Sequence, residues 1–144
     1  MQENVIQKAK GKRTKVMNWM EILGWDENNL EDIRFVGYSY LKEGKYEIAA
    51  NFFKALNILS PNSWYDLQAL GNLFLQQGQS LEALNYIDQS LKLNPRHGPT
   101  LLNRVKALFL LGYNKQAISQ AQILLRCKNR TVASQASALI SSYS

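Results

Sequence analysis

Side chains that could act as a nucleophile, a base or a metal ligand are scarce in this sequence. The single histidine, His97, lies in a Pro-Arg-His-Gly-Pro segment with no carboxylate or cysteine near it along the chain. The single cysteine, Cys127, lies between Arg126 and Lys128, and we expect it to be inert or structural. No metal-ligand spacing, phosphate-binding loop or nucleophile elbow occurs. We therefore expect no enzymatic activity, no metal and no cofactor.

The sequence therefore favours a binding function. The residues that bind would be carried by pairs of helices joined by a glycine turn. Residues 67–95 contain two runs of apolar residues at helical spacing, which are separated at Gly78 and closed by Pro95. The large, small and aromatic positions of this hairpin are Leu67, Leu70, Gly71, Phe74, Ala83, Ile87 and Pro95. This arrangement resembles a tetratricopeptide repeat, a unit of roughly 34 residues.

The same pattern recurs about 34 residues to either side. Upstream, the matching residues are Ile33, Val36, Gly37, Tyr40, Ala49, Phe53 and Pro61. Downstream the match is weaker, because Arg104 and Val105 replace an apolar residue and a glycine, and Ala121 replaces a large residue. Each unit also has a glycine at its turn: Gly44, Gly78 and Gly112. Three units are about the minimum at which stacked hairpins bury a continuous core.

The predicted architecture is all-α: a right-handed superhelix of three hairpins, with an N-terminal helix before them and a C-terminal capping helix after them. We expect one domain over residues 16–144, preceded over residues 1–15 by a basic arm that is either a solvated tail or orders on a partner. The repeats are expected at residues 30–63, 64–97 and 98–130, and the capping helix at 131–143. Individual helices are predicted at 16–23, 30–42, 46–59, 64–77, 81–93, 101–111 and 115–127. Helix caps are expected at Gly24, within residues 26–29, at Thr100 and at Thr131.

Composition and charge narrow the possible surroundings and partners. No apolar run reaches about 18 residues, and the first 30 residues lack a continuous signal-peptide core, so we expect a cytoplasmic protein with no membrane span. The net charge is +4 over residues 1–15, −6 over 16–88 and +8 over 89–144. The basic last third is either a solvated face or a site for an acidic protein partner. We disfavour nucleic acid, because no aromatic stacking platform interleaves with the lysines and arginines.

The predicted helix at residues 16–23 is apolar around most of its circumference. A short helix of this kind either packs deeply on the first repeat or makes a subunit contact, through self-association or with a second small co-chaperone. Aromatic residues and methionine are enriched at such contacts. The candidates for this contact are Trp19, Met20 and Trp25.

A ligand-binding groove is expected on the concave face, which the first helix of each stacked hairpin lines. The residues predicted to bind a client there are Arg34, Tyr38, Leu41, Tyr65, Gln68, Asn72, Leu75, Leu102, Lys106 and Phe109. The same helical positions also point Glu31 and Lys42 into the groove. The aromatic and leucine side chains suit apolar anchors, while Gln68 and Asn72 can hydrogen-bond an extended backbone. Ordinary packing between neighbouring first helices is the alternative for three of them: Leu41, Leu75 and Phe109.

A different tetratricopeptide mode, in which groove cations clamp a C-terminal carboxylate, fits this sequence poorly. Arg34 occupies one clamp position, but the other clamp positions hold Tyr38, Ala69 and Pro99. We therefore disfavour the tails of heat-shock chaperones as ligands.

The segment at residues 53–59, Phe-Lys-Ala-Leu-Asn-Ile-Leu, points to a narrower family. Together with the layout of a helix, three repeats and a closing helix, it resembles the tetratricopeptide-type chaperones of bacterial type III secretion over roughly residues 16–140. The resemblance implies a groove that holds an aggregation-prone secreted subunit, of needle or translocator type, and prevents its premature assembly before export. The alternative is a scaffold that bridges protein partners with its basic C-terminal face.

Overall fold

Three glycine turns set the arrangement of the helices. Gly44, Gly78 and Gly112 have φ angles of 76°, 75° and 85°, in the left-handed region that glycine enters without steric strain. Each of them lies just after the end of one helix and lets the chain reverse into the next. The helices of the three repeats are therefore arranged as antiparallel pairs.

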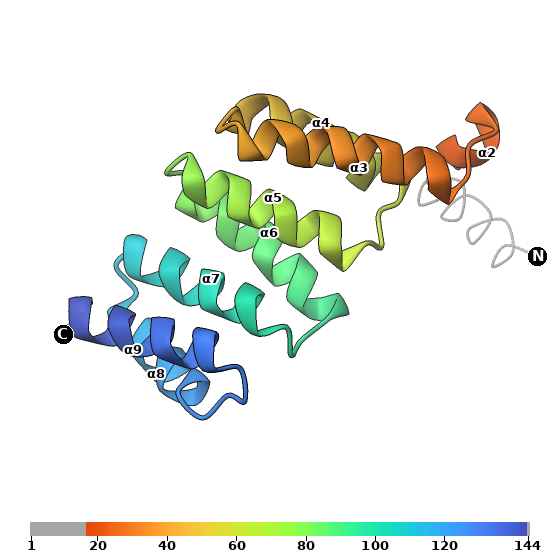
Figure 1. Ribbon diagram of the computed structural model, residues 1–144. Helices are drawn as coiled ribbons and strands as arrows, with labels where there is room; N and C mark the ends of the chain where they lie inside the picture. The colour runs from red at the N-terminus through yellow and green to blue at the C-terminus, as the bar shows by residue number, and fades with distance from the viewer. Residues whose placement is uncertain (1–16, 144) are drawn as a thin grey trace, which may run out of the picture.

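The computed structural model describes residues 17–143, which form α-helices and no strand (Figure 1). The helices are α2 (Trp19–Leu23), α3 (Glu27–Lys42), α4 (Tyr46–Leu59), α5 (Trp64–Gln76), α6 (Ser80–Leu93), α7 (Gly98–Leu110), α8 (Asn114–Leu124) and α9 (Arg130–Tyr143). The predicted all-α repeat architecture is confirmed. The predicted arm at residues 1–15 lies outside the described residues. None of the described helices combines the length and the apolar character that crossing a bilayer requires.

The hairpins stack in two layers (Figure 1). The first helices, α3, α5 and α7, form one layer, and the second helices, α4, α6 and α8, lie behind them. From α3 onward each helix packs on the next, and α7 also packs on α5 and on α9. Helix α9 therefore takes the place that the first helix of a fourth repeat would occupy, while α2 lies at the other end of the stack.

Close approach of paired helices depends on small residues at fixed positions. A Cβ atom added to Gly71 would lie 2.6 Å from Cγ1 of Ile87, so this glycine leaves room for the large partner. In the third repeat the two volumes are exchanged, since Val105 stands at the glycine position and Ala121 at the position of Ile87. Both are fully buried members of one core cluster. In the third repeat the larger Val105 is thus compensated by the smaller Ala121.

The first repeat begins earlier than expected, at Glu27 instead of residue 30. The cap predicted within residues 26–29 is confirmed: Oδ1 of Asp26 accepts a hydrogen bond from the Asn28 N–H at 2.9 Å, and Oδ1 of Asn29 accepts one from the Asp26 N–H at 2.9 Å. The predicted C-cap at Gly24 is also confirmed, with a φ of 67°. The early start adds about one turn to α3.

Two other predicted caps are wrong. Thr100 lies inside α7, which begins at Gly98, because Pro99 is well accommodated in a first helical turn where no N–H partner is needed. Helix α9 begins at Arg130, ahead of Thr131, and Oδ1 of Asn129 accepts a hydrogen bond from the Val132 N–H at 3.2 Å. The preceding helix, α8, ends at Leu124, three residues before its predicted end.

Candidate functional site

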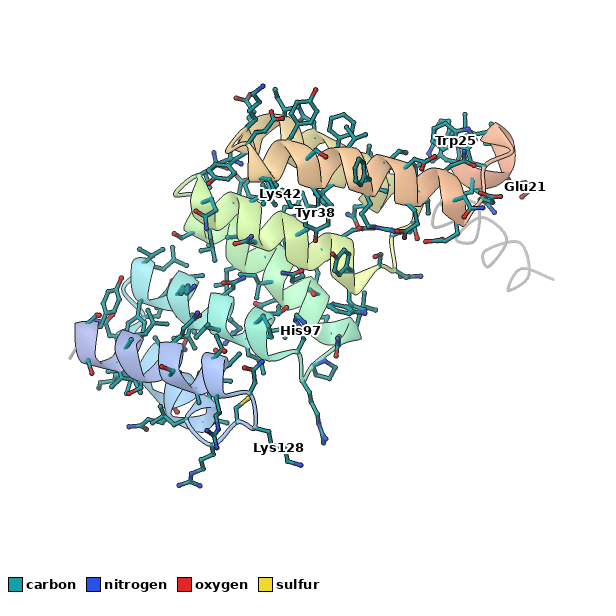
Figure 2. All side chains as sticks on the ribbon, in the orientation of Figure 1. Glu21, Trp25, Tyr38, Lys42, His97 and Lys128 are labelled. Carbon is teal, nitrogen blue, oxygen red and sulfur yellow. The ribbon has the colours of Figure 1, made fainter. Side chains whose placement is uncertain are left out.

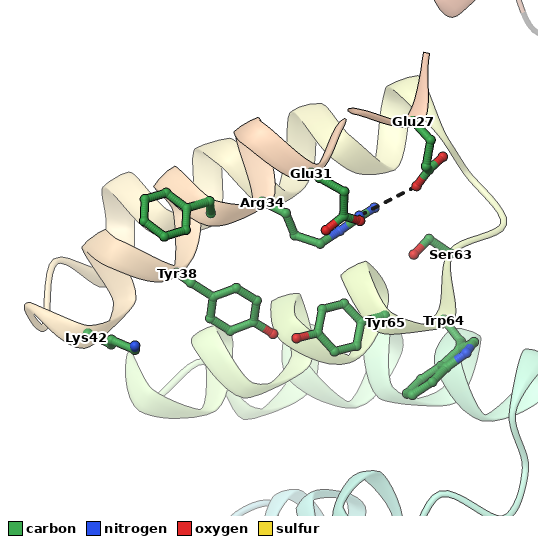
Figure 3. A pocket seen from close by; sticks show the side chains of 9 residues that line it. Glu27, Glu31, Arg34, Tyr38, Lys42, Ser63, Trp64 and Tyr65 are labelled. Carbon is green, nitrogen blue, oxygen red and sulfur yellow. Dashed lines mark hydrogen bonds and ion pairs between the residues drawn. The ribbon is translucent and has the colours of Figure 1, made fainter. Parts of the chain in front are cut away.

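A cavity of about 750 Å³ lies between the first helices of the first two repeats (Figure 3). Helix α3 contributes one stripe of residues at three- or four-residue spacing, and the start of α5 faces it. The cavity is lined by Glu27, Glu31, Arg34, Phe35, Tyr38, Lys42, Ser63, Trp64 and Tyr65. Lys42 lies at one end of the cavity, and Glu27 lies at the other (Figure 3).

A buried ion pair supports one side of this cavity. Nε and Nη2 of Arg34 donate to Oδ1 and Oδ2 of Asp66 at 2.7 and 2.9 Å, and Asp66 is fully buried. Arg34 also donates to Glu31 and lies 3.7 Å from Glu27. The hydrogen bond to Asp66 raises the pKa of Arg34 above its ordinary value. Arg34 is thus fully engaged in bracing the second repeat against the first, and it is not a free cation for a ligand carboxylate.

Aromatic rings form the middle of the cavity. The Tyr38 ring packs edge-on against Phe53 with 5.2 Å between centroids, and lies 5.9 Å from the Tyr65 ring. The hydroxyl groups of Tyr38 and Tyr65 point toward each other (Figure 3). Burial, and then a hydrogen bond with Tyr65, raise the pKa of Tyr38. Phe35 is 74% exposed, so this wall offers apolar surface that residues 17–143 do not cover.

Trp64 is contacted by α6 and by the segment that joins α6 to α7. The Ser90 hydroxyl donates to the Trp64 carbonyl oxygen at 2.8 Å, and the Trp64 and His97 rings lie 4.7 Å apart. His97 Nδ1 is 2.7 Å from the hydroxyl oxygen of the buried Thr100, and burial lowers the pKa of His97. His97 lies in the segment between α6 and α7 (Figure 2). Its contacts give it a structural role in fixing Trp64.

The structure brings only part of the predicted groove set to the cavity. Arg34, Tyr38 and Tyr65 line it, as do Glu31 and Lys42 from the same helical positions. Two further predicted residues, Leu41 and Leu75, are half-buried and pack against the core, as the packing alternative expects. The remaining partly exposed members of the set do not line this cavity: Gln68, Asn72 and Lys106.

The expectation that Leu102 and Phe109 line an open groove is wrong. Each is only 4% exposed and belongs to the core cluster that α7 forms with α8 and α9. The Phe109 ring stacks on Tyr143 of α9 with 4.2 Å between centroids and 10° between planes. The capping helix covers this part of α7, so these two side chains are not open to a ligand.

Four lining residues escaped the sequence reasoning: Glu27, Phe35, Ser63 and Trp64. Glu27 was missed because α3 was expected to begin later. A signal for it existed, since Glu27 lies four residues before Glu31 and continues the same helical stripe once Asp26 is taken as the cap. Phe35 is the first-repeat equivalent of Ala69, a clamp position that was considered only in the second repeat.

Trp19 and Met20 of α2 and Trp25, just after its C-cap, are the residues predicted for a subunit contact, and the structure separates them. Met20 packs against the core of the first repeat, whereas Trp19 and Trp25 are each 38% exposed. None of the five residues of α2 is buried. The predicted role of this helix in self-association remains a prediction, and the exposed tryptophans are the residues available for it.

The basic last third has a separate hollow of about 470 Å³, lined by Arg104, Lys115, Gln116, Ser119, Gln120 and Ile123. Arg104 Nε donates to Oδ1 of Asp88 at 2.7 Å, and its Nη1 donates to Oε1 of Gln120 at 3.0 Å. Arg104 therefore bridges the second helices of two repeats, which accounts for its departure from the apolar pattern. Residues 17–143 contain no group of three or more His, Cys, Asp or Glu placed to hold a metal ion.

Comparison with known proteins places the fold among repeat proteins. The family model described as tetratricopeptide repeat matches residues 67–97. No curated protein matches by sequence. The fold is similar to that of PcrH from Pseudomonas aeruginosa in complex with the chaperone binding region of PopD, with a TM-score of 0.75, 19% identity, and coverage of 83% of this chain and 94% of that one.

Two further solved structures are similar. The type III secretion translocator chaperone SycD of Yersinia enterocolitica has a TM-score of 0.74 at 19% identity, covering 85% of this chain and 96% of that one. A type III secretion complex from Aeromonas hydrophila has a TM-score of 0.78 at 17% identity, with 95% of each chain covered. At these identities the likeness establishes the fold.

Proposed function

We propose that this protein is a cytoplasmic chaperone of bacterial type III secretion, and that it holds an extended segment of a secreted subunit between α3 and α5. The observation that carries the proposal is the aromatic-walled cavity of about 750 Å³ on a tetratricopeptide fold. The likeness to PcrH, solved with a region of PopD, supports a secreted subunit as the client. Both needle and translocator subunits remain client classes that this chemistry fits.

The mechanism is occlusion. Apolar side chains of the client pack against Phe35, Tyr38 and Tyr65, which removes them from water and from other copies of the client. Burying one leucine-sized side chain contributes about 1.5–3 kcal/mol before the cost of ordering the segment. Gln68 and Asn72, farther along the same helix as Tyr65 and outside the cavity, would hydrogen-bond the client backbone where the segment continues along α5. No bond is made or broken, so no enzymatic step is involved.

A matched pair of variants tests this function. Tyr65→Glu puts a charge into the cavity wall, while Leu81→Glu puts the same charge on α6, where Leu81 is exposed and outside the cavity. Each tagged variant is used to purify partners from the native source at high salt, with partners identified by mass spectrometry and helicity by circular dichroism. We expect wild type and Leu81→Glu to retain one small secreted protein and Tyr65→Glu to lose it. Equal retention by the helical Tyr65→Glu variant would contradict the proposal.

A second candidate is a scaffold that uses the basic C-terminal face. The observation in its favour is that, among the basic residues at 89–143, only Arg104 has an ion pair within the described chain. A contact through this face should weaken steeply from low to moderate salt, because exposed charges are screened, whereas an apolar contact should change little. Partners retained at low salt and lost at high salt would favour the scaffold.

We also propose that α2 is the surface for self-association. It exposes Trp19, Ile22 and Leu23, and Trp25 is exposed just after its end. Sedimentation of the wild type and of a Trp19→Ser, Ile22→Ser double variant tests this role. We expect the wild type to sediment as a dimer and the variant as a folded monomer. An unchanged sedimentation coefficient in the variant would contradict it.

A further inference from the structure

The two ends of the cavity carry opposite charge. At one end, Arg34 is neutralised by the fully buried Asp66, to which it is bound through two hydrogen bonds. Glu27 and Glu31 also approach Arg34, but their side chains remain 72% and 62% exposed. These four groups together carry three negative charges and one positive charge, so this end has an excess of negative charge that faces solvent.

Lys42 supplies the charge at the other end (Figure 3). It is exposed and has no ion pair with any residue that the structure describes. Tyr38 and Tyr65 lie between the two ends (Figure 3), and Phe35 of α3 also lines the cavity. The cavity is therefore ordered along α3 as acidic, aromatic and basic.

The dipole of α3 explains part of this order but not all of it. Acidic residues are favoured in a first helical turn and basic residues in a last turn, which accounts for Glu27 and Lys42. Glu31 lies beyond the first turn, where the dipole effect has fallen off. That Glu27, Glu31 and Lys42 all line one cavity is likewise not a consequence of the dipole.

We infer that the cavity selects its client by charge order as well as by apolar character. Resting on the proposed function, this inference gives the client segment a basic side chain beside Glu27 and Glu31, apolar side chains against the aromatic wall, and an acidic side chain beside Lys42. From Glu27 to Lys42, α3 rises about 22 Å, which an extended chain of about seven residues spans. A segment with the reverse charge order meets like charges at both ends.

The charges thus set which way the segment lies. Aromatic and aliphatic contacts alone are non-directional, so a stretch of alternating apolar residues could shift by two residues or bind reversed. Two fixed ends of opposite sign remove that ambiguity. For exposed pairs of this kind we expect about a tenfold preference for the matched over the reversed orientation of one segment.

Selection from a random peptide library tests the inference without knowledge of the client. A displayed library of twelve-residue peptides is selected at low salt for binding to the full chain. The peptide length is roughly the seven-residue span plus flanking residues. The wild type is compared with a charge-swapped variant, Glu27→Lys, Glu31→Lys and Lys42→Glu. A control variant with the same net charge, Glu47→Lys, Glu82→Lys and Lys92→Glu, changes exposed residues outside the cavity.

We expect the wild type and the control to enrich apolar segments with a basic residue at one end and an acidic residue at the other. On the charge-swapped variant, a segment selected on the wild type should bind in the reversed orientation, so that a photo-crosslinker at its basic end labels residues around position 42 instead of those around positions 27 and 31. Lys42→Glu alone, which disturbs no ion pair of the described chain, should lose the acidic preference even if the triple variant fails to fold. Apolar segments enriched without any charge order would overturn this inference and leave the proposed function standing. Failure of the wild type to enrich apolar segments would overturn both.

Discussion

Arg34 of the first repeat and Asp66 of the second form a two-hydrogen-bond ion pair whose carboxylate is entirely removed from solvent. The distances are 2.7 Å from Nε to Oδ1 and 2.9 Å from Nη2 to Oδ2. The two partners are not equivalent. Arg34 also contacts Glu27 and Glu31, whereas within the described chain the Asp66 side chain forms hydrogen bonds to Arg34 alone. This asymmetry leads to a prediction about stability.

Removal of the arginine should cost more than removal of the carboxylate charge. Arg34→Met leaves a fully buried, uncompensated Asp66 and should lower the free energy of unfolding by about 3–5 kcal/mol. Asp66→Asn should cost less, because Arg34 keeps Glu27 and Glu31. The double variant Arg34→Met, Asp66→Leu should recover part of the loss, since no buried charge remains. Denaturant unfolding of the three variants measures this order, and an equal loss for Arg34→Met and Asp66→Asn would contradict it.

The second repeat pairs the small Gly71 with the large Ile87, whereas the third repeat pairs Val105 with the small Ala121. We therefore expect substitutions at positions 71 and 87 to be energetically coupled. Gly71→Val alone should be strongly destabilising, because its side chain would meet Ile87 at a distance that real Cβ atoms do not show. Ile87→Ala alone should cost about 2–5 kcal/mol through the cavity it leaves. Together the two changes reproduce the third repeat and should cost less than the sum of the singles. A double-mutant cycle measures the coupling, and additive losses would refute the volume exchange.

His97 should make stability depend on pH in the acidic range. Burial lowers the pKa of His97 in the folded protein, so below its ordinary value of about 6.5 the unfolded chain binds more protons than the folded chain. The free energy of unfolding should therefore fall as pH drops from about 6.5 through the lowered folded-state pKa. Unfolding curves between neutral pH and mildly acidic pH are compared for wild type and His97→Asn. The variant should show a shallower decline, and an identical decline would remove His97 as the cause.

Helix α9 should act as a cover for α7. A chain truncated before Arg130 loses the Tyr143 ring that stacks on Phe109 and the Val132 and Ala136 side chains of the same core cluster. We expect this truncation to increase binding of an apolar fluorescent dye and to cause concentration-dependent aggregation. Tyr143→Ala is the milder comparison, because it removes one partly exposed ring and keeps the helix. A truncated chain that stays monomeric with unchanged dye binding would show that α9 is dispensable.

The sequence predicted the hairpins well because their determinants are local. The turn glycines, the apolar spacing and the small residue at Gly71 act within one repeat, where pattern and structure coincide. The cap at Asp26 was likewise visible, yet the helix start was placed too late, and Glu27 was lost from the site as a result.

What could not be predicted depends on contacts between repeats. The burial of Phe109 follows from where α9 packs, and no spacing rule within the third repeat encodes that position. The engagement of Arg34 by Asp66 joins residues 32 positions apart, so a groove cation and a structural brace looked alike in sequence. The exposed Phe35 was missed because its repeat position was considered only in the second repeat, where it holds the small side chain of Ala69.

Site-specific photo-crosslinking at Phe35 examines whether a client segment occupies the cavity. Benzoylphenylalanine replaces Phe35, an exposed ring on the cavity wall, and in a parallel chain it replaces Leu81, which lies outside the cavity. Both chains are expressed in the native source and irradiated, and crosslinked peptides are identified by mass spectrometry. We expect the position 35 chain to crosslink to one apolar segment of a secreted subunit, and the position 81 chain to give no such product. Crosslinking of the secreted subunit at position 81 and not at position 35 would contradict the proposed site.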